Sequence, residues 1–275
     1  MRTRLPRRLC SIALFALFVV KGTAVTFTVV NANDNGAGTL RQAILDANAT
    51  PGIDTIAFNI PPGGSTSITI TSATFVVTDP VVIDGTTQPG FASTPVVELT
   101  SSFEAPWLQC LQIEAGNSVV RGLSFHGLKG DAVILKDGGS NVIEGNMFGL
   151  RRDGVSSHGN SYRAIILINS SFNTIGGTNA AQRNVVAGSA NAGINLLLGS
   201  SYNRIIGNYV GTDVTGTKAR GNYRGISVSA GTNNIIGGAG PGERNIISGS
   251  GWTGVQLWIG ESNRVVGNYI GTDVS

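Results

Sequence analysis

The sequence predicts an all-β protein with the fold of a right-handed parallel β-helix, a single-stranded solenoid of about 30 residues per coil. Three observations predict this class: an internal repeat, strand-like alternation inside the repeat, and the absence of helical periodicity. The same glycines and asparagines return about sixty positions apart from Asn141 to Gly199 and from Asn203 to Gly260, and a third copy begins at Ser262. Self-similarity at a fixed period indicates stacked units that bury their apolar faces against each other.

Each sixty-residue unit divides into two coils. Short apolar runs begin at Ala132, Ala164, Gly193, Gly225 and Gly254, with steps of 32, 29, 32 and 29 residues. Inside each run every second residue is apolar, the alternation typical of strands; these residues are Val133 and Leu135, Ile165 and Leu167, Ile194 and Leu196, Ile226 and Val228, and Val255 and Leu257.

No coil has room for a helix, so we expect three short strands per coil joined by tight turns. Sequential parallel strands require right-handed connections, which sets the expected hand. One asparagine recurs in each coil directly before a short strand, at positions 141, 173, 203, 234 and 263. We expect these asparagines to form a structural ladder in a turn, where each amide can bond the backbone or the asparagine of the next coil.

Residues 1–24 are predicted to be a secretory signal peptide. Four arginines up to Arg8 precede an apolar run from residue 9 to 20 and a small-residue segment that ends at Ala24. The apolar run is too short to span a bilayer. The mature protein is therefore expected to be secreted or attached to the cell surface, with outer-membrane association as one form of attachment and with no membrane span after signal removal.

Removing the leader changes the charge balance. Five of the 19 basic residues lie in the leader, which leaves 14 basic against 16 acidic residues. The mature chain is slightly acidic, which argues against a nucleic-acid partner. Cys10 is lost with the leader, so Cys110 has no disulfide partner and is interpreted as a small buried residue.

Residues 25–60 are predicted to form an N-terminal cap, followed by the β-helix over residues 61–275. Residues 26–30 have the pattern of a strand, and residues 39–48 have the pattern of the only clear helix in the mature chain. Thr39 and Gln42 fit a capping box, and four apolar residues form one stripe. Such a helix can cover the apolar cross-section and unpaired strand edges of the first coil.

The segment from Asn33 to Ile44, with Ala47-Asn48 and residues 51–59, resembles the N-terminal segment of bacterial secreted right-handed β-helix proteins that carry a Cys-Ser-Leu-Arg-Glu-Ala type domain. Residues 207–213 and 267–273 are similar to repeats of the same proteins. This chain has Gly38-Thr39 and Gln42 where the family pattern has Cys-Ser and Glu. The resemblance implies a pectate-lyase-like fold, whose members include lyases, hydrolases, adhesins and phage tailspikes.

The sequence offers no obvious catalytic site. A glycoside hydrolase needs two carboxylates that flank the scissile bond, and none of the five aligned runs carries an acid. A polysaccharide lyase, which would use acids to hold Ca²⁺ and a base, stays open as the alternative. Asp213 and Asp273 occupy equivalent turn positions, where an Asx turn with Thr215 is the simpler explanation. His126 and His158 share no coil position, so no metal pair and no cofactor are expected, with Ca²⁺ as the exception left open.

One surface carries the predicted binding site. The outward positions of the five runs are Ile134 and Lys136, Ile166 and Ile168, Asn195 and Leu197, Ser227 and Ser229, and Gln256 and Trp258. An exposed apolar stripe marks a binding surface, whereas the same stripe under a loop is ordinary core, and the sequence leaves both readings open. If it is exposed, Trp258, Gln256, Asn195 and Lys136 are the ligand-binding candidates, because an indole stacks on a sugar ring and amides bond hydroxyls.

We therefore expect an exported, noncatalytic cell-surface or extracellular protein that serves adhesion or binds polysaccharide, with a polysaccharide or cell-surface glycan as partner. A carbohydrate-active enzyme of the lyase type is the alternative. The third copy stops at Ser275 in the middle of a coil, so the sequence is interpreted as C-terminally incomplete, with end-to-end self-association as a consequence.

Overall fold

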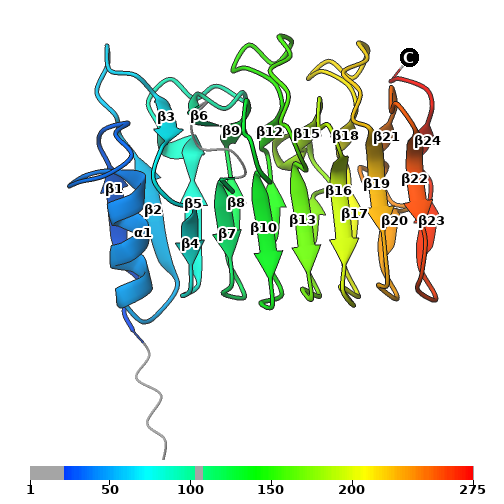
Figure 1. The fold of residues 1–275 in the computed structure, drawn as a ribbon, viewed down its shortest axis with the longest axis horizontal. Helices are drawn as coiled ribbons and strands as arrows, with labels where there is room; N and C mark the ends of the chain where they lie inside the picture. Colours follow the sequence, from blue (N-terminus) through cyan, green and yellow to red (C-terminus); the bar gives the residue numbers. More distant parts are fainter. Residues whose placement is uncertain (1–21, 103–107, 275) are drawn as a thin grey trace, which may run out of the picture.

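The computed structural model describes residues 22–102 and 108–274, so most of the predicted signal peptide lies outside the described residues. The chain forms three large parallel sheets, an arrangement compatible with a parallel β-helix (Figure 1). Within the described ranges, each coil contributes one strand to each of the three sheets in a fixed order, and the sheets are called A, B and C below. Successive coils then lie side by side along the long axis of the molecule.

Sheet A contains β1 (Thr26–Val29), β2 (Asp54–Phe58), β5 (Val81–Asp84), β8 (Val119–Arg121), β11 (Val142–Glu144), β14 (Thr174–Gly176), β17 (Arg204–Ile206), β20 (Ile235–Gly237) and β23 (Arg264–Val266). Sheet B contains β3 (Ser67–Ile70), β6 (Val97–Ser101), β9 (Leu123–Phe125), β12 (Met147–Phe148), β15 (Val185–Val186), β18 (Tyr209–Val210), β21 (Ile246–Ile247) and β24 (Tyr269–Ile270). Sheet C contains β4 (Phe75–Val77), β7 (Leu111–Ile113), β10 (Val133–Lys136), β13 (Ile165–Ile168), β16 (Ala192–Leu197), β19 (Arg224–Val228) and β22 (Thr253–Leu257). Two short 3₁₀ helices, η1 (Gly85–Thr87) and η2 (Ala180–Gln182), lie in connections.

The register in sheet C pairs the residues that the repeat alignment pairs. Val133 pairs with Ile165, Ile165 with Ile194, Ile194 with Ile226, and Ile226 with Val255. All of these pairings are parallel, so each apolar side chain lies above the equivalent one in the preceding coil. The alternation read from the sequence therefore puts one residue set into the interior at every coil.

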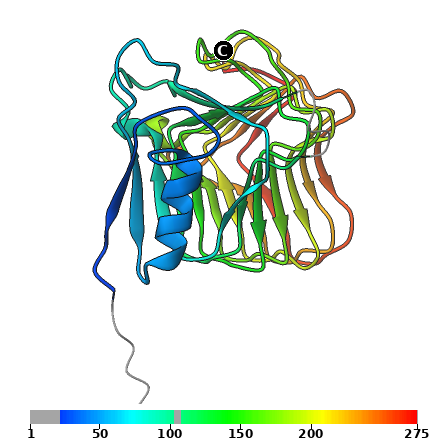
Figure 2. The same ribbon diagram turned by 60° about the vertical axis from the view of Figure 1, so that its left-hand side comes forward.

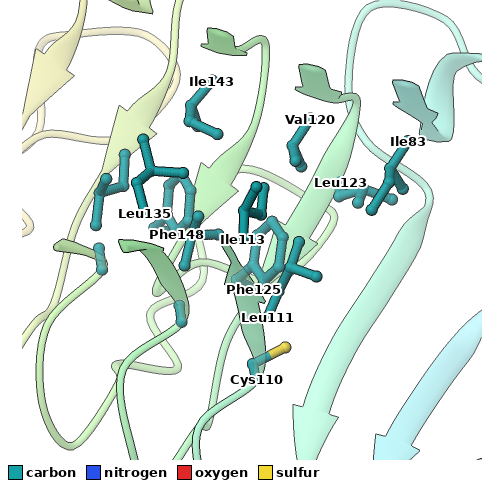
Figure 3. Close-up of a cluster of buried hydrophobic side chains, with 14 of the residues drawn as sticks. Ile83, Cys110, Leu111, Ile113, Val120, Leu123, Phe125, Leu135, Ile143 and Phe148 are labelled. Carbon is teal, nitrogen blue, oxygen red and sulfur yellow. The ribbon is translucent and has the colours of Figure 1, made fainter. Parts of the chain in front are cut away.

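The interior is filled by these stacked aliphatic and aromatic side chains. Figure 3 shows Ile113 and Leu135 of sheet C, Val120 and Ile143 of sheet A, and Phe125 and Phe148 of sheet B in one cluster. The rings of Phe125 and Phe148 stack with centroids 5.0 Å apart and planes 8° apart. Cys110 is fully buried in the same cluster, and burial raises the pKa of its thiol well above the usual range. The interpretation of Cys110 as a small core residue is confirmed.

The predicted asparagine ladder is present. The side-chain oxygen of Asn173 accepts from the backbone N–H of Asn141 at 2.9 Å, and Asn203 accepts in the same way from Asn173. The contact repeats from Asn203 to Asn234 at 2.9 Å and from Asn234 to Asn263 at 3.0 Å. From Asn173 onward, each side-chain amide also donates to the next Asn oxygen, so the ladder satisfies buried polar groups that would otherwise have no partner.

A second ladder runs between sheets A and B, and the sequence analysis did not predict it. Asn146 donates its backbone N–H to Asn184 at 3.0 Å, and Asn208 donates in the same way to Asn245 at 2.9 Å. Asn184 reaches Asn208, and Asn245 reaches Asn268, through both backbone and side-chain nitrogens. Two corners of each coil are therefore held to the next coil by stacked amides.

Helix α1 (Leu40–Ala49) lies at the N-terminal end of the stack (Figure 2). Its buried face consists of Leu40, Ala43, Ile44 and Ala47, and it packs on β1, β2 and β4. Thr39 is the N-cap and accepts from the backbone N–H of Gln42 at 3.2 Å. The reciprocal half of the expected capping box is absent, because the Gln42 side chain bonds Asp46 instead.

Among the described helices, none has the length and apolar character needed to cross a membrane.

Replacement of Asn203 by alanine is expected to lower the free energy of unfolding by about 2–4 kcal/mol, because it leaves several buried ladder groups without partners. Chemical denaturation measures the change. Asn59→Ala is the matched control, since Asn59 is exposed, and it is expected to shift the midpoint very little. Equal effects of the two substitutions would contradict the role of the ladder.

Candidate functional site

Two of the predicted ligand-binding residues, Asn195 and Gln256, lie on the same face of sheet C, with Ser227 between them. Asn195 of β16 pairs with Ser227 of β19, and Ser227 pairs with Gln256 of β22. The Ser227 hydroxyl donates to the Gln256 side-chain oxygen at 3.3 Å. The side-chain oxygen of Asn195 is buried without a hydrogen-bond partner among the described residues. Asn195, Ser227 and Gln256 therefore form a polar row across three neighbouring strands, which we call the amide row.

Trp258 directly follows β22, two residues beyond Gln256, and is 72% exposed. Its backbone N–H donates to Val228, which continues the register of the sheet. An exposed indole next to amide groups is the arrangement by which proteins bind sugar rings.

Lys136 does not join this group. It lies on β10, four strands from β22, which corresponds to roughly 19 Å at the usual spacing of strands. Its ammonium pairs with Glu114 at 3.5 Å. Lys136 can therefore contact only the far end of a ligand that also contacts Trp258.

Of the two interpretations of the apolar stripe that the sequence left open, the covered one holds for its first half. Ile134 and Ile166 are only 2% and 1% exposed, so they belong to the buried part of the protein. Asn195 and Ser227, at 9% and 4%, are also largely covered. The accessible part of this face lies toward β22, where Gln256 is half-buried and Trp258 is open.

A second aromatic group lies at the opposite end of the same strands. Tyr223 precedes β19 and Trp252 precedes β22, and their rings stack with centroids 5.7 Å apart. The guanidinium of Arg224 lies over the Trp252 ring at 4.5 Å. Both rings are about half exposed, so β22 has an exposed aromatic residue at each end, Trp252 and Trp258, with Gln256 between them.

The two histidines are in contact, contrary to the sequence-based expectation that they occupy unrelated positions. The loop after β12 returns His158 to the end of β9, where its Nδ1 lies 2.9 Å from Nδ1 of His126. On the other side of the His126 ring, Nε2 lies 3.1 Å from a Glu98 oxygen. The alignment by strand runs could not reveal this contact, because it ignored the loop that carries His158.

The contacts from Glu98 through His126 to His158 can assign protons to specific ring nitrogens. If His126 donates from Nε2 to Glu98, its Nδ1 accepts from His158, and the remaining His158 nitrogen is left as an acceptor at the surface. Partial burial of the ring and the positive charges of His126, Arg151 and Lys129 hold the pKa of His158 below its usual 6.5, against the opposing effect of Glu98.

Asp213 forms an Asx turn, as the simpler explanation predicts. One carboxylate oxygen accepts from the backbone N–H and the hydroxyl of Thr215 at 3.1 and 2.6 Å. Burial alone would raise the pKa of Asp213, but the hydrogen bonds from Thr215 and Lys218 outweigh it and hold the pKa below its usual 3.8. Within the part of the chain that the structure describes, no group of three or more His, Cys, Asp or Glu side chains is placed to hold a metal ion.

A groove on the outer face of sheet B is the site that the sequence analysis missed. It has a volume of about 500 Å³ and is lined by Arg183, Tyr209, residues 238–242, Arg244 and Tyr269, among others. The Arg183 guanidinium lies over the Tyr209 ring at 4.2 Å, and the Arg244 guanidinium lies over the Tyr269 ring at 4.1 Å. Both arginines and both tyrosines recur at equivalent repeat positions, and that recurrence was the available signal.

Comparison with known proteins does not identify a family. No protein-family model matches the chain, and no curated protein matches it significantly.

The low pKa of His158 predicts a pH-dependent contribution to stability. Protonation is disfavoured in the folded state, so this contribution is present above pH 6.5 and is lost as the pH falls through the lowered folded-state pKa. The difference in unfolding free energy between the wild type and His158→Gln should therefore shrink between about pH 7.5 and pH 5. Denaturant titrations at each pH measure this difference in unfolding free energy. A difference that stays constant or grows at low pH would contradict the lowered pKa of His158.

Proposed function

We propose that this chain is an exported, noncatalytic protein of the cell surface or extracellular space that binds an extended polysaccharide. The proposal includes a right-handed sense for the solenoid and a capping role for α1. The observation that carries the function is the amide row, which ends at the exposed indole of Trp258.

The chemistry of this surface suits a sugar chain. Amide and hydroxyl groups exchange hydrogen bonds with sugar hydroxyls, and aromatic rings stack on the apolar faces of pyranose rings. The accessible part of this surface is Gln256 on β22, with the Trp258 indole beyond it and the stacked Tyr223 and Trp252 rings at the other end of the strand, so it offers contacts to more than one sugar unit.

The predicted leader and the slightly acidic mature chain support export and a partner other than nucleic acid. Adhesion to a glycan-coated surface is the simplest role for a protein with these properties.

A polysaccharide lyase is the second candidate, and the His126–His158 contact is the observation that favours it. An imidazole held by a second histidine and a carboxylate can accept a proton from a sugar carbon during elimination. The amide row contains no such base. Binding without bond cleavage is therefore the better account of the surface that carries Trp258.

Binding of the mature protein to immobilised neutral and acidic oligosaccharides tests the proposal. Trp258→Ala should weaken binding about fivefold to tenfold, because the indole supplies the stacking surface. Phe172→Ala is the matched control, since Phe172 is an exposed aromatic residue outside the sheet C face, and it should leave the affinity unchanged.

Two results would contradict the proposal. One is the absence of binding to any oligosaccharide. The other is the formation of unsaturated products, detected by ultraviolet absorbance, that is abolished by His158→Ala, because that result would assign the chain to the lyases.

A further inference from the structure

We propose that the groove on sheet B is a second binding site, specific for an acidic polysaccharide that carries one carboxylate or sulfate group per disaccharide. This inference rests on the proposed function only in taking polysaccharide as the ligand class. The site lies on another sheet and uses different residues.

The groove is built from a unit that repeats every second coil. The residue before each asparagine of the second ladder alternates between glycine and arginine, in the order Gly145, Arg183, Gly207, Arg244, Gly267. Each arginine reaches the glycine of the next coil. Its Nε donates to that glycine's carbonyl, at 3.3 Å from Arg183 to Gly207 and at 2.6 Å from Arg244 to Gly267.

Each guanidinium is therefore held in place before a ligand arrives. The backbone carbonyl fixes the Nε side, and the tyrosine two residues after the glycine lies beneath the guanidinium plane. The terminal nitrogens of Arg183 and Arg244 form no hydrogen bond or ion pair with any described residue. Two adjacent N–H groups of a fixed guanidinium match the two oxygens of a carboxylate or sulfate.

Four of the other described arginines are already neutralised by an ion pair, unlike Arg183 and Arg244. Arg41, Arg121, Arg163 and Arg204 each pair with a carboxylate at 2.6–2.9 Å. Glu243 is next to Arg244 in sequence, but its carboxylate is taken by Arg204 and by the backbone N–H of Gly240. None of the residues that line the groove is acidic, and neither Arg183 nor Arg244 forms an ion pair with a described residue.

The spacing of the two arginines selects the ligand. They are separated by two coil steps, since Val185 pairs with Tyr209, Tyr209 with Ile246, and Ile246 with Tyr269. Two steps correspond to about 10 Å at the usual strand spacing. An extended 1,4-linked disaccharide has a comparable length, so a chain with one acidic group per disaccharide presents its charges in register with both arginines.

The groove also has room for sugar rings between the charges. Tyr209 and Tyr269 provide aromatic surface, and a neighbouring cavity of about 310 Å³ shares Arg183 and extends along the face past Val185 and Met147. Single-stranded nucleic acid can also use arginines and aromatic rings. The slightly acidic charge balance of the mature chain disfavours it, because nucleic-acid binding needs an extended basic surface.

The test measures binding of the full mature protein to hyaluronan oligosaccharides, with one carboxylate per disaccharide, and to polygalacturonate, with one per sugar. Neutral cello-oligosaccharides and single-stranded DNA serve as comparison ligands. Hyaluronan should bind most tightly of the four at low salt and should weaken at about 0.5 M salt, where charges are screened. The double variant Arg183→Gln/Arg244→Gln should weaken hyaluronan binding at least about tenfold and remove most of the salt dependence.

Arg264→Gln is the control for loss of one exposed positive charge and should have no effect, and thermal unfolding checks that each variant is folded.

Unchanged hyaluronan binding by the folded double variant would overturn the site. Polygalacturonate or DNA binding as tightly as hyaluronan, with the same loss in the double variant, would overturn the ligand class. If these ligands fail while neutral oligosaccharides still bind and respond to Trp258→Ala, the second site is wrong and the proposed function stands. If no saccharide binds, the proposed function itself fails.

Discussion

The structure depends on one requirement, which is that the buried polar groups at the corners of the coils find partners in neighbouring coils. The two asparagine ladders meet most of this requirement, because each side-chain oxygen accepts from the backbone of the preceding coil and, from Asn173 and Asn146 onward, each amide donates to a neighbouring coil. A coil displaced by one residue would leave these groups unpaired in an apolar interior, at a cost comparable to a large part of a domain's stability. The ladders therefore fix the register of the stack.

A fixed register gives the outer faces a regular spacing. Residues that recur in the sixty-residue repeat return two strands further along the same sheet. Arg183 and Arg244 are consequently held at a constant separation, each on the tyrosine of the following coil. The amide row arises differently, since Asn195, Ser227 and Gln256 are not identical but occupy one register position on sheet C. Both surfaces follow the direction of the stack, which suits an extended polymer more than a compact ligand.

The sequence was sufficient for the parallel sheets, the strand pairing in sheet C and the first ladder, because these follow from local periodicity and from the repeat. It was not sufficient for features that depend on the surroundings of a side chain. Ile134 and Ile166 have the outward positions expected of surface residues, yet they are buried. The contact between His126 and His158 depends on the path of a loop, and the groove depends on arginine side chains that cross from one coil to the next. The alternation of apolar and polar residues along a strand gives no information on the path of that loop or on the positions of those arginine side chains.

Hydrogen exchange at the ladder amides tests the central claim most directly. If the ladders fix the register, the backbone N–H groups of Asn173, Asn203 and Asn234, and of Asn184 and Asn208 in the second ladder, should exchange only through global unfolding. Their exchange free energies should then equal the free energy of unfolding measured with denaturant. Exchange at these amides as fast as at exposed loop amides such as Gly63 would contradict the account.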